Sequence, residues 1–144
     1  FSVWTKITGP SYYQHIAGWR GGIDFWFLIL SGQSTTEARF GGTVNYYDVN
    51  MDYGPYFGNW AHVTFTLDVN AGIEVLYING VNVGQVTGIS GNFIGTASTF
   101  TLGCNYGGGF AMNGKIGGAA AYSRALTEAE VVSEFNRTKT RYGL

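Results

Sequence analysis

Residues 60–69 read WAHVTFTLDV and carry the clearest strand pattern in the chain. Apolar residues take every second position, and polar residues take the positions between them. Because successive side chains of a strand point to opposite faces, this alternation predicts a strand with one face in a core. The predicted core residues of this strand are Ala61, Val63, Phe65, Leu67 and Val69.

A hairpin is predicted directly after this strand. Residues 73–78 are mostly apolar, and Asn79-Gly80 follows them. This dipeptide is a strong hairpin signal, because both central residues of a type I′ turn need positive φ. Residues 81–86 are therefore the predicted returning strand.

Apolar residues again take every second position near residue 100. Phe100, Leu102 and Cys104 alternate with small or polar residues, and a last strand is predicted at 115–122. We expect Phe100, Leu102 and Ile116 to lie in the core. Cys104 is interpreted as a buried small apolar residue and not as a reactive thiol.

The first half of the chain also has a strand pattern. Residues 1–8 alternate, Gly9-Pro10-Ser11 supplies a turn, and the apolar segment 12–19 completes a predicted first hairpin. Residues 25–30 are apolar on both faces, so they need cover on both sides. Gly41-Gly42 leaves two readings open, a hairpin between 36–40 and 43–49 or a bulge in one bent strand.

One helix is predicted, at the end of the chain. Thr127-Glu128-Ala129-Glu130 forms a capping box, and Leu126 can pack on Val131. Val131, Val132 and Phe135 give the helix an apolar face. A helix this short is not stable alone, so it must dock on the strands.

Composition limits the function classes. The 144 residues suit a single domain with a core of its own. Eight Lys plus Arg against nine Asp plus Glu offer no positive field for nucleic acid or for a membrane surface. The longest apolar run is too short to span a bilayer. Cys104 is the only cysteine, which excludes an intrachain disulfide and a cysteine zinc cluster.

Four segments together resemble the laminin-G-like family of concanavalin A-like domains. They are WAHVTFTLD at 60–68, LYINGV at 76–81, NGKIG at 113–117 and YSRALTEAE at 122–130. The resemblance implies an all-β fold, a two-sheet antiparallel jelly-roll sandwich with one short C-terminal helix, as a single domain over residues 1–144. Residues 134–144 resemble the end of such domains in structural proteins of tailed bacteriophages.

Two features depart from this resemblance. Family members often carry an acidic residue where this chain has Gly117, which Gly118 follows. The family fold also usually opens with an edge strand before the one at Phe1. A chain that starts at Phe without Met therefore suggests the C-terminal part of a longer protein.

Catalysis and metal binding are not predicted. A glycosidase needs two carboxylates that flank the scissile bond, and Glu74 stands alone in its strand. His15 and His62 have no adjacent nucleophile pattern. The oxygen-rich run at 48–52 is interpreted as a solvated turn and not as a calcium site, and Asn136-Arg137-Thr138 as a chance glycosylation sequon. We expect no enzyme activity, no metal and no cofactor.

The remaining candidate function is ligand recognition by aromatic and amide side chains. Tyrosine rings suit the apolar face of a sugar, although the same tyrosines could simply cover a sheet face. If strands alternate in direction, the loops at 50–58, 79–80 and 104–112 share one end of the sandwich. The predicted carbohydrate-binding residues are Asp52, Tyr53, Asn79, Asn105 and Tyr106, with Trp19 and Arg20 depending on the Gly41-Gly42 question.

Two functions stay open at this point. One is a non-catalytic decoration or adhesion domain at a virion surface, packed against copies of itself or another structural protein. The other is a carbohydrate-binding module of a secreted or cell-surface protein, and a glycan-active enzyme is a minority alternative. The doubly apolar segment 25–30 favours a homo-oligomer, because a lone sandwich covers one face of each sheet.

Overall fold

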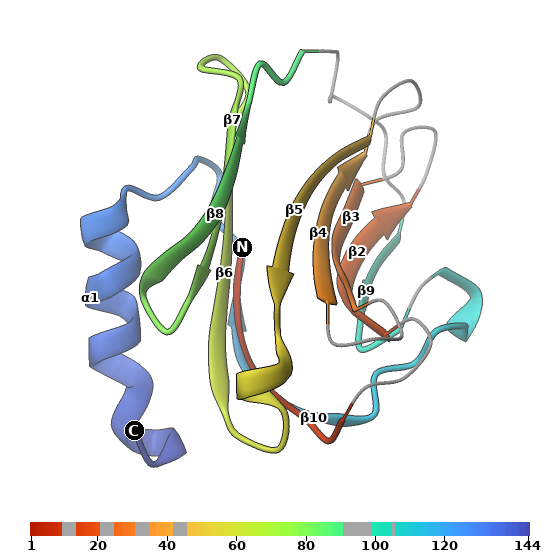
Figure 1. Ribbon diagram of the computed structural model, residues 1–144, viewed down its shortest axis with the longest axis vertical. Coiled ribbons are helices and arrows are strands. Elements are labelled where there is room, and N and C mark those ends of the chain that lie inside the picture. The colour runs from red at the N-terminus through yellow and green to blue at the C-terminus, as the bar shows by residue number, and fades with distance from the viewer. Residues whose placement is uncertain (10–13, 21–24, 31–34, 42–45, 91–98, 105) are drawn as a thin grey trace.

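The fold is a sandwich of two five-stranded antiparallel sheets with a helix on one outer face (Figure 1). The computed structural model describes residues 1–9, 14–20, 25–30, 35–41, 46–90, 99–104 and 106–144. Of residues 19–20, 25–30, 35–41, 46–48, 50 and 106 it describes the backbone alone. The predicted all-β sandwich with one C-terminal helix is confirmed.

The elements have the following bounds. The first sheet has the order β10 (Gly114–Ala120), β1 (Ser2–Ile7), β6 (Ala61–Asp68), β7 (Ile73–Ile78), β8 (Val81–Thr87). The second sheet has the order β5 (Tyr46–Asp52), β4 (Thr35–Gly41), β3 (Phe25–Leu30), β2 (Gln14–Arg20), β9 (Thr99–Leu102). The helices are α1 (Glu128–Thr138) and the 3-10 turns η1 (Gly54–Tyr56), η2 (Tyr106–Gly108) and η3 (Lys139–Tyr142).

The predicted first hairpin is wrong. β1 pairs with β10 and β6 in the first sheet, whereas β2 pairs with β3 and β9 in the second sheet. The chain therefore crosses between the sheets after Gly9. A local turn signal reverses the chain, but it does not decide which sheet the returning strand joins.

Pairing in the second sheet answers the open question at Gly41-Gly42. β4 and β5 are two separate strands, paired from Thr35–Asp52 to Gly41–Tyr46. The hairpin interpretation is confirmed, and the bulge interpretation is wrong.

The predicted hairpin after β6 is confirmed. Asn79 has φ 53° and Gly80 has φ 80°, as a type I′ turn requires. The Asn79 side chain also holds the neighbouring strand, because its Oδ1 accepts a 2.8 Å hydrogen bond from the His62 N–H. The turn thereby fixes the start of β6 against the end of β7.

The central strand β6 is buried on both faces. Ala61, Val63 and Phe65 are at most 1% exposed and belong to the core between the sheets, as predicted. The opposite face carries His62, Thr64 and Thr66, which are buried because the C-terminal segment covers this side. Leu67 is half-buried, and Val69 is 46% exposed because it lies beyond the end of the strand.

The core prediction fails on β9. Phe100 is 38% exposed and Leu102 is 42% exposed. β9 is a four-residue strand at the edge of the second sheet, and within the described ranges β2 is its strand partner. The Phe100 ring meets the Phe1 ring edge-on at a centroid distance of 5.6 Å. Ile116 does pack against the core, and Cys104 is half-buried, not fully buried.

The C-terminal helix begins as predicted and docks on the first sheet (Figure 1). Thr127 and Glu130 form a reciprocal capping box. Val131 is fully buried and packs with Val75, Tyr77 and Leu126, whereas Val132 is 36% exposed. The helix lies away from β3, so it does not cover the doubly apolar segment 25–30, whose side chains are outside the described residues.

Candidate functional site

Three loops gather where β1 ends. The Gly58 N–H donates a 2.7 Å hydrogen bond to the Ile7 carbonyl, and the Thr8 N–H donates to the Asn113 carbonyl at 2.8 Å. The 79–80 turn lies at the same end, where the Asn79 N–H donates to the His62 carbonyl at 2.8 Å. These loops therefore lie at the same end of the sandwich, where backbone hydrogen bonds hold the 50–58 loop and Asn113 to the end of β1 and the 79–80 turn to β6.

Some predicted binding residues lie at this end. Asp52 is exposed, and its Oδ1 accepts a 2.8 Å hydrogen bond from the Gly54 N–H. Asn79 is half-buried, and its Oδ1 is occupied by His62. Tyr106 opens η2, but its side chain and all of Asn105 lie outside the described residues.

Tyr53 cannot contact a ligand and leaves the predicted set. Its side chain is 1% exposed and is part of the core between the sheets. Its hydroxyl shares a 3.2 Å hydrogen bond with the Thr5 hydroxyl, and burial raises the pKa of Tyr53 to about 12. The ring instead anchors the loop through a tilted contact with Tyr56 and an edge contact with Phe57.

Trp19 and Arg20 lie at the opposite end of the second sheet. β2 starts at Gln14, whose side chain donates to Gly9 and accepts from Asn113, and it ends at Arg20. Six residues of extended strand span about 20 Å. The structure therefore separates these two residues from Asp52 and Asn79.

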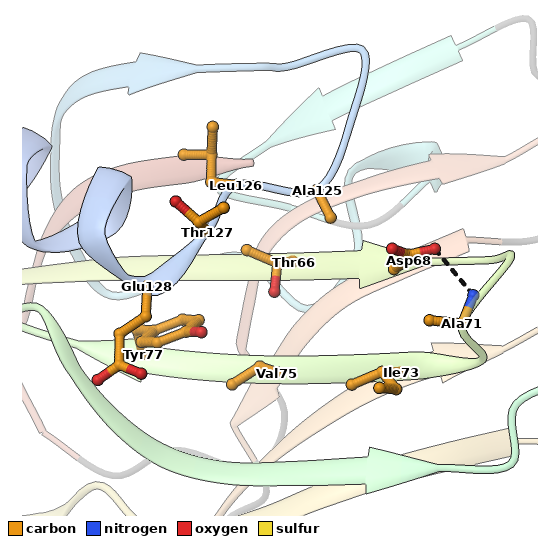
Figure 2. Close-up of a pocket in the computed structure, with 10 residues that line it drawn as sticks. All are labelled: Thr66, Asp68, Ala71, Ile73, Val75, Tyr77, Ala125, Leu126, Thr127 and Glu128. Carbon is orange, nitrogen blue, oxygen red and sulfur yellow. Dashed lines mark hydrogen bonds between the residues drawn. The ribbon is translucent and has the colours of Figure 1, made fainter.

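A hollow of about 260 Å³ lies elsewhere, on the outer face of the first sheet (Figure 2). β6 and β7 form its floor, and the segment that leads into α1 forms one wall. Ten residues line it: Thr66, Asp68, Ala71, Ile73, Val75, Tyr77, Ala125, Leu126, Thr127 and Glu128. We call this hollow the helix-side groove.

The groove has an apolar middle and an acid at each end (Figure 2). Val75 and Ile73 lie between Asp68, at the end of β6, and Glu128, at the start of α1. Asp68 Oδ1 accepts hydrogen bonds from the N–H groups of Asn70 and Ala71 at 3.0 and 2.9 Å, which fixes this carboxylate. The groove is therefore amphipathic and acidic.

Tyr77 lines the groove with the edge of its ring, and the face of the ring is not exposed. Its side chain is 5% exposed, because it packs with Val75, Val131 and Leu126. Burial, with a smaller effect from the Glu128 carboxylate, raises the pKa of Tyr77. The hydroxyl therefore stays protonated at neutral pH and can donate a hydrogen bond.

The acid spacing does not suit glycoside hydrolysis. Asp68 pairs with Ile73 in the register, and Glu128 lies beside Tyr77 four residues further along β7. Four residues of strand span about 13 Å. Catalytic carboxylates lie about 5 to 9.5 Å apart.

The remaining acidic and metal-ligating side chains of the described residues do not suggest catalysis or metal binding. Glu74 is completely buried, so it cannot reach a substrate. Among the described residues, no three side chains of His, Cys, Asp or Glu gather in a way that could hold a metal ion. None of the described helices has the length and apolar character that crossing a membrane requires.

Sequence reasoning missed the helix-side groove. It identified Leu126, Thr127 and Glu128 as a helix start, and it assigned the outward residues of β6 no role. Nothing local signals that residues 125–128 return to β6 and β7, some 50 positions back along the chain. The sequence does show that a helix this short must dock on the strands. It does not show which face of which sheet the helix covers.

Comparison with known proteins supports the fold. A family model described as the concanavalin A-like lectin/glucanases superfamily matches residues 1–132. No relative is found among curated protein sequences.

Several solved structures are similar. A presumed carbohydrate-binding protein from Bacteroides ovatus is 22% identical with a TM-score of 0.70, and the match covers 91% of this chain but 38% of that protein. The CBM40 of Ruminococcus gnavus IT-sialidase, bound to α2,3-sialyllactose, is 15% identical with a TM-score of 0.72 over 93% of this chain and 80% of the other. The leech intramolecular trans-sialidase is 17% identical, with a TM-score of 0.68, 92% coverage of this chain and 22% of the other. At these identities the likeness concerns the fold alone.

Proposed function

Since this chain belongs to the concanavalin A-like lectin/glucanase superfamily, we propose that it is a non-catalytic glycan-binding domain acting at an extracellular surface. The observation that carries the proposal is the match of the whole sandwich to a carbohydrate-binding module bound to sialyllactose. A fold hosts many functions, so the surface chemistry must also suit a glycan.

The surface chemistry supports this proposal. Sugar sites combine apolar contact with a few placed hydrogen-bonding groups. The helix-side groove offers this combination through Val75, Ile73 and the edge of Tyr77, between Asp68 and Glu128. The loop end around Asp52 is a second polar surface, at the end of the sandwich where three loops meet.

Binding without hydrolysis is proposed because of the carboxylate positions. The two groove acids are separated by about 13 Å of strand, too far for an acid and a nucleophile to act on one bond. Glu130 is occupied by Arg124, whose guanidinium donates two hydrogen bonds to it at 2.8 and 2.6 Å.

A glycan panel tests the proposal. The purified protein is titrated with neutral, amino and sialylated oligosaccharides by calorimetry, and reducing-sugar release is followed with the same ligands. We expect saturable binding to at least one class, with no release. Absence of binding to every class would contradict the proposal, and release that disappears on replacing one carboxylate would contradict its non-catalytic part.

A virion-surface role is the second candidate, favoured by the resemblance of residues 134–144 to the ends of tailed-bacteriophage structural proteins. In that role the domain would decorate or attach the particle by packing against copies of itself. A closed homo-oligomer is the expected signature, and its measurement is described in the Discussion.

A further inference from the structure

We propose that the helix-side groove binds an oligosaccharide that carries free amino groups. This inference rests on the proposed glycan-binding function and adds to it a place and a ligand class.

The charge of the groove selects against acidic sugars. Asp68 and Glu128 are the charged residues of the lining, and it contains no Lys, Arg or His. Arg124, next to the lining residue Ala125, is bound to Glu130. An acidic sugar would place its carboxylate near two others, whereas an ammonium group would gain an opposite charge at either end.

The shape of the groove fits a short sugar chain. Its middle is apolar along β7, from Ile73 to Val75, and its two acids lie at the ends (Figure 2). A sugar chain can place its C–H faces on this middle part and its amino groups near the acids. The buried Tyr77 lines the groove at the end where Glu128 lies.

The strand pairing argues against a basic peptide that binds as an added strand. In this mode an extended peptide pairs with a free sheet edge, where backbone groups are unpaired. The floor strand β6 pairs with β1 and β7, and β7 pairs with β6 and β8. A peptide backbone would therefore find no strand edge here, and a sugar needs none.

The experiment uses four ligands and paired variants. The ligands are a glucosamine trimer, a glucose trimer, 3′-sialyllactose and an oligolysine peptide, titrated at low ionic strength. Asp68→Asn and Glu128→Gln each remove one charge, and Asp68→Asn keeps the Oδ1 acceptor for Asn70 and Ala71. Asp52→Asn removes the same charge at the loop end, the competing polar surface of the proposed function, and therefore reports on that surface.

Two further variants test whether blocking the groove prevents binding. Ile73→Arg places a long cation in the groove, and Val81→Arg places the same side chain on β8 at a residue that is 62% exposed and outside the lining. Unfolding midpoints of all variants are measured first, so that a folding defect is not mistaken for lost binding.

We expect the glucosamine trimer to bind most tightly and sialyllactose least tightly. Each charge-removing groove variant should weaken the glucosamine trimer about fivefold, the size of one exposed ion pair. Ile73→Arg should weaken it more than tenfold, and its control Val81→Arg should bind like the unmodified protein.

The other outcomes separate this inference from the proposed function. If glycans bind but the groove variants bind as the unmodified protein does, or Asp52→Asn alone weakens binding, the groove inference is wrong and the glycan-binding function stands. If no glycan binds, both are wrong. If only an oligolysine peptide binds, and Ile73→Arg abolishes this, the groove is a peptide site and both proposals are overturned.

Discussion

The ring of Tyr142 lies almost parallel to the ring of Trp4, with centroids 4.1 Å apart and planes 14° apart. Trp4 is on β1, and Tyr142 ends η3, so this stack fastens the C-terminal segment to the outer face of the first sheet. The Trp4 Nε1–H donates a 3.0 Å hydrogen bond to Thr138, and the Gly118 N–H donates to the Tyr142 hydroxyl at 2.8 Å.

The position of Tyr142 predicts that Gly117 cannot accept a side chain without cost. A β-carbon on Gly117 would lie 2.5 Å from the Tyr142 hydroxyl oxygen and 2.6 Å from its Cε1. Gly117→Ala should therefore lower the free energy of unfolding by about 1 to 3 kcal/mol, as overpacking does. Gly118→Ala is the control, since its β-carbon would lie 3.4 Å from the same oxygen. Urea unfolding measures both.

A double-mutant cycle tests whether Tyr142 causes the loss of stability in Gly117→Ala. Tyr142→Ala removes the stack on Trp4 and should itself destabilise the protein. In that background, Gly117→Ala should cost much less, because the ring that it meets is gone. An unchanged cost of Gly117→Ala in the Tyr142→Ala protein would show that the clash is not with Tyr142.

We expect truncation to cost much more stability at Phe65 than at Phe100. Phe65 is 1% exposed in the core, so Phe65→Ala should lower the free energy of unfolding by roughly 3 to 5 kcal/mol. Phe100 is 38% exposed and contacts Phe1 edge-on, so Phe100→Ala should cost about 1 kcal/mol. Equal losses in urea unfolding would contradict the exposed position of β9.

The elements that sequence reasoning located correctly depend on local signals. The Asn79-Gly80 turn needs positive φ at two adjacent residues, and the capping box joins Thr127 to Glu130 within one helical turn. Each signal lies within four residues and does not depend on the rest of the chain. The alternation of β6 was equally local, and Phe65 is in the core as it predicted.

The parts that could not be predicted depend on contacts between distant segments. Trp4 and Tyr142 are far apart in the sequence, and nothing near either residue specifies the other. The placement of Tyr53 in the core depends on Thr5, and the groove depends on where α1 docks. The exposure of Phe100 depends on β9 lying at a sheet edge, which alternation cannot reveal.

Self-association remains a prediction from the sequence. β3 lies in the second sheet, whereas α1 covers the first, so the helix does not cover the doubly apolar residues 25–30 (Figure 1). We expect a closed dimer or trimer, in which one repeated patch buries itself by symmetry. Light scattering over a range of protein concentrations measures this, and a monomer at every concentration would contradict it.

We expect the protein to lose stability in mild acid because two of its histidines are buried. Burial lowers the pKa of His15 to about 4 and also lowers the pKa of His62, and both are 2% exposed. Because an unfolded histidine titrates near 6.5, the unfolded state binds more protons below that pH, so stability falls as the pH drops from about 6.5 towards 4. For His15 the full loss is at most about 3 kcal/mol.

Two other groups with shifted pKa values must be separated from the histidines. Burial lowers the pKa of the Phe1 amino group to about 6, so its contribution to stability also falls as the pH drops from about 8 to 6. The carboxylate of Glu130 titrates at a lower pH. Hydrogen bonds from Arg124 lower the pKa of Glu130 to about 2, so its contribution is complete above about pH 4.5 and is lost only below it. Urea unfolding between about pH 7 and pH 5 therefore reports on His15, His62 and the Phe1 amino group together, and the histidine part is the part that substitution of the histidines removes. The slope of stability against pH should fall in His15→Gln and in His62→Gln, and fall furthest in the double variant. A slope that neither substitution changes would mean that these histidines are protonated as easily in the folded protein as in the unfolded chain.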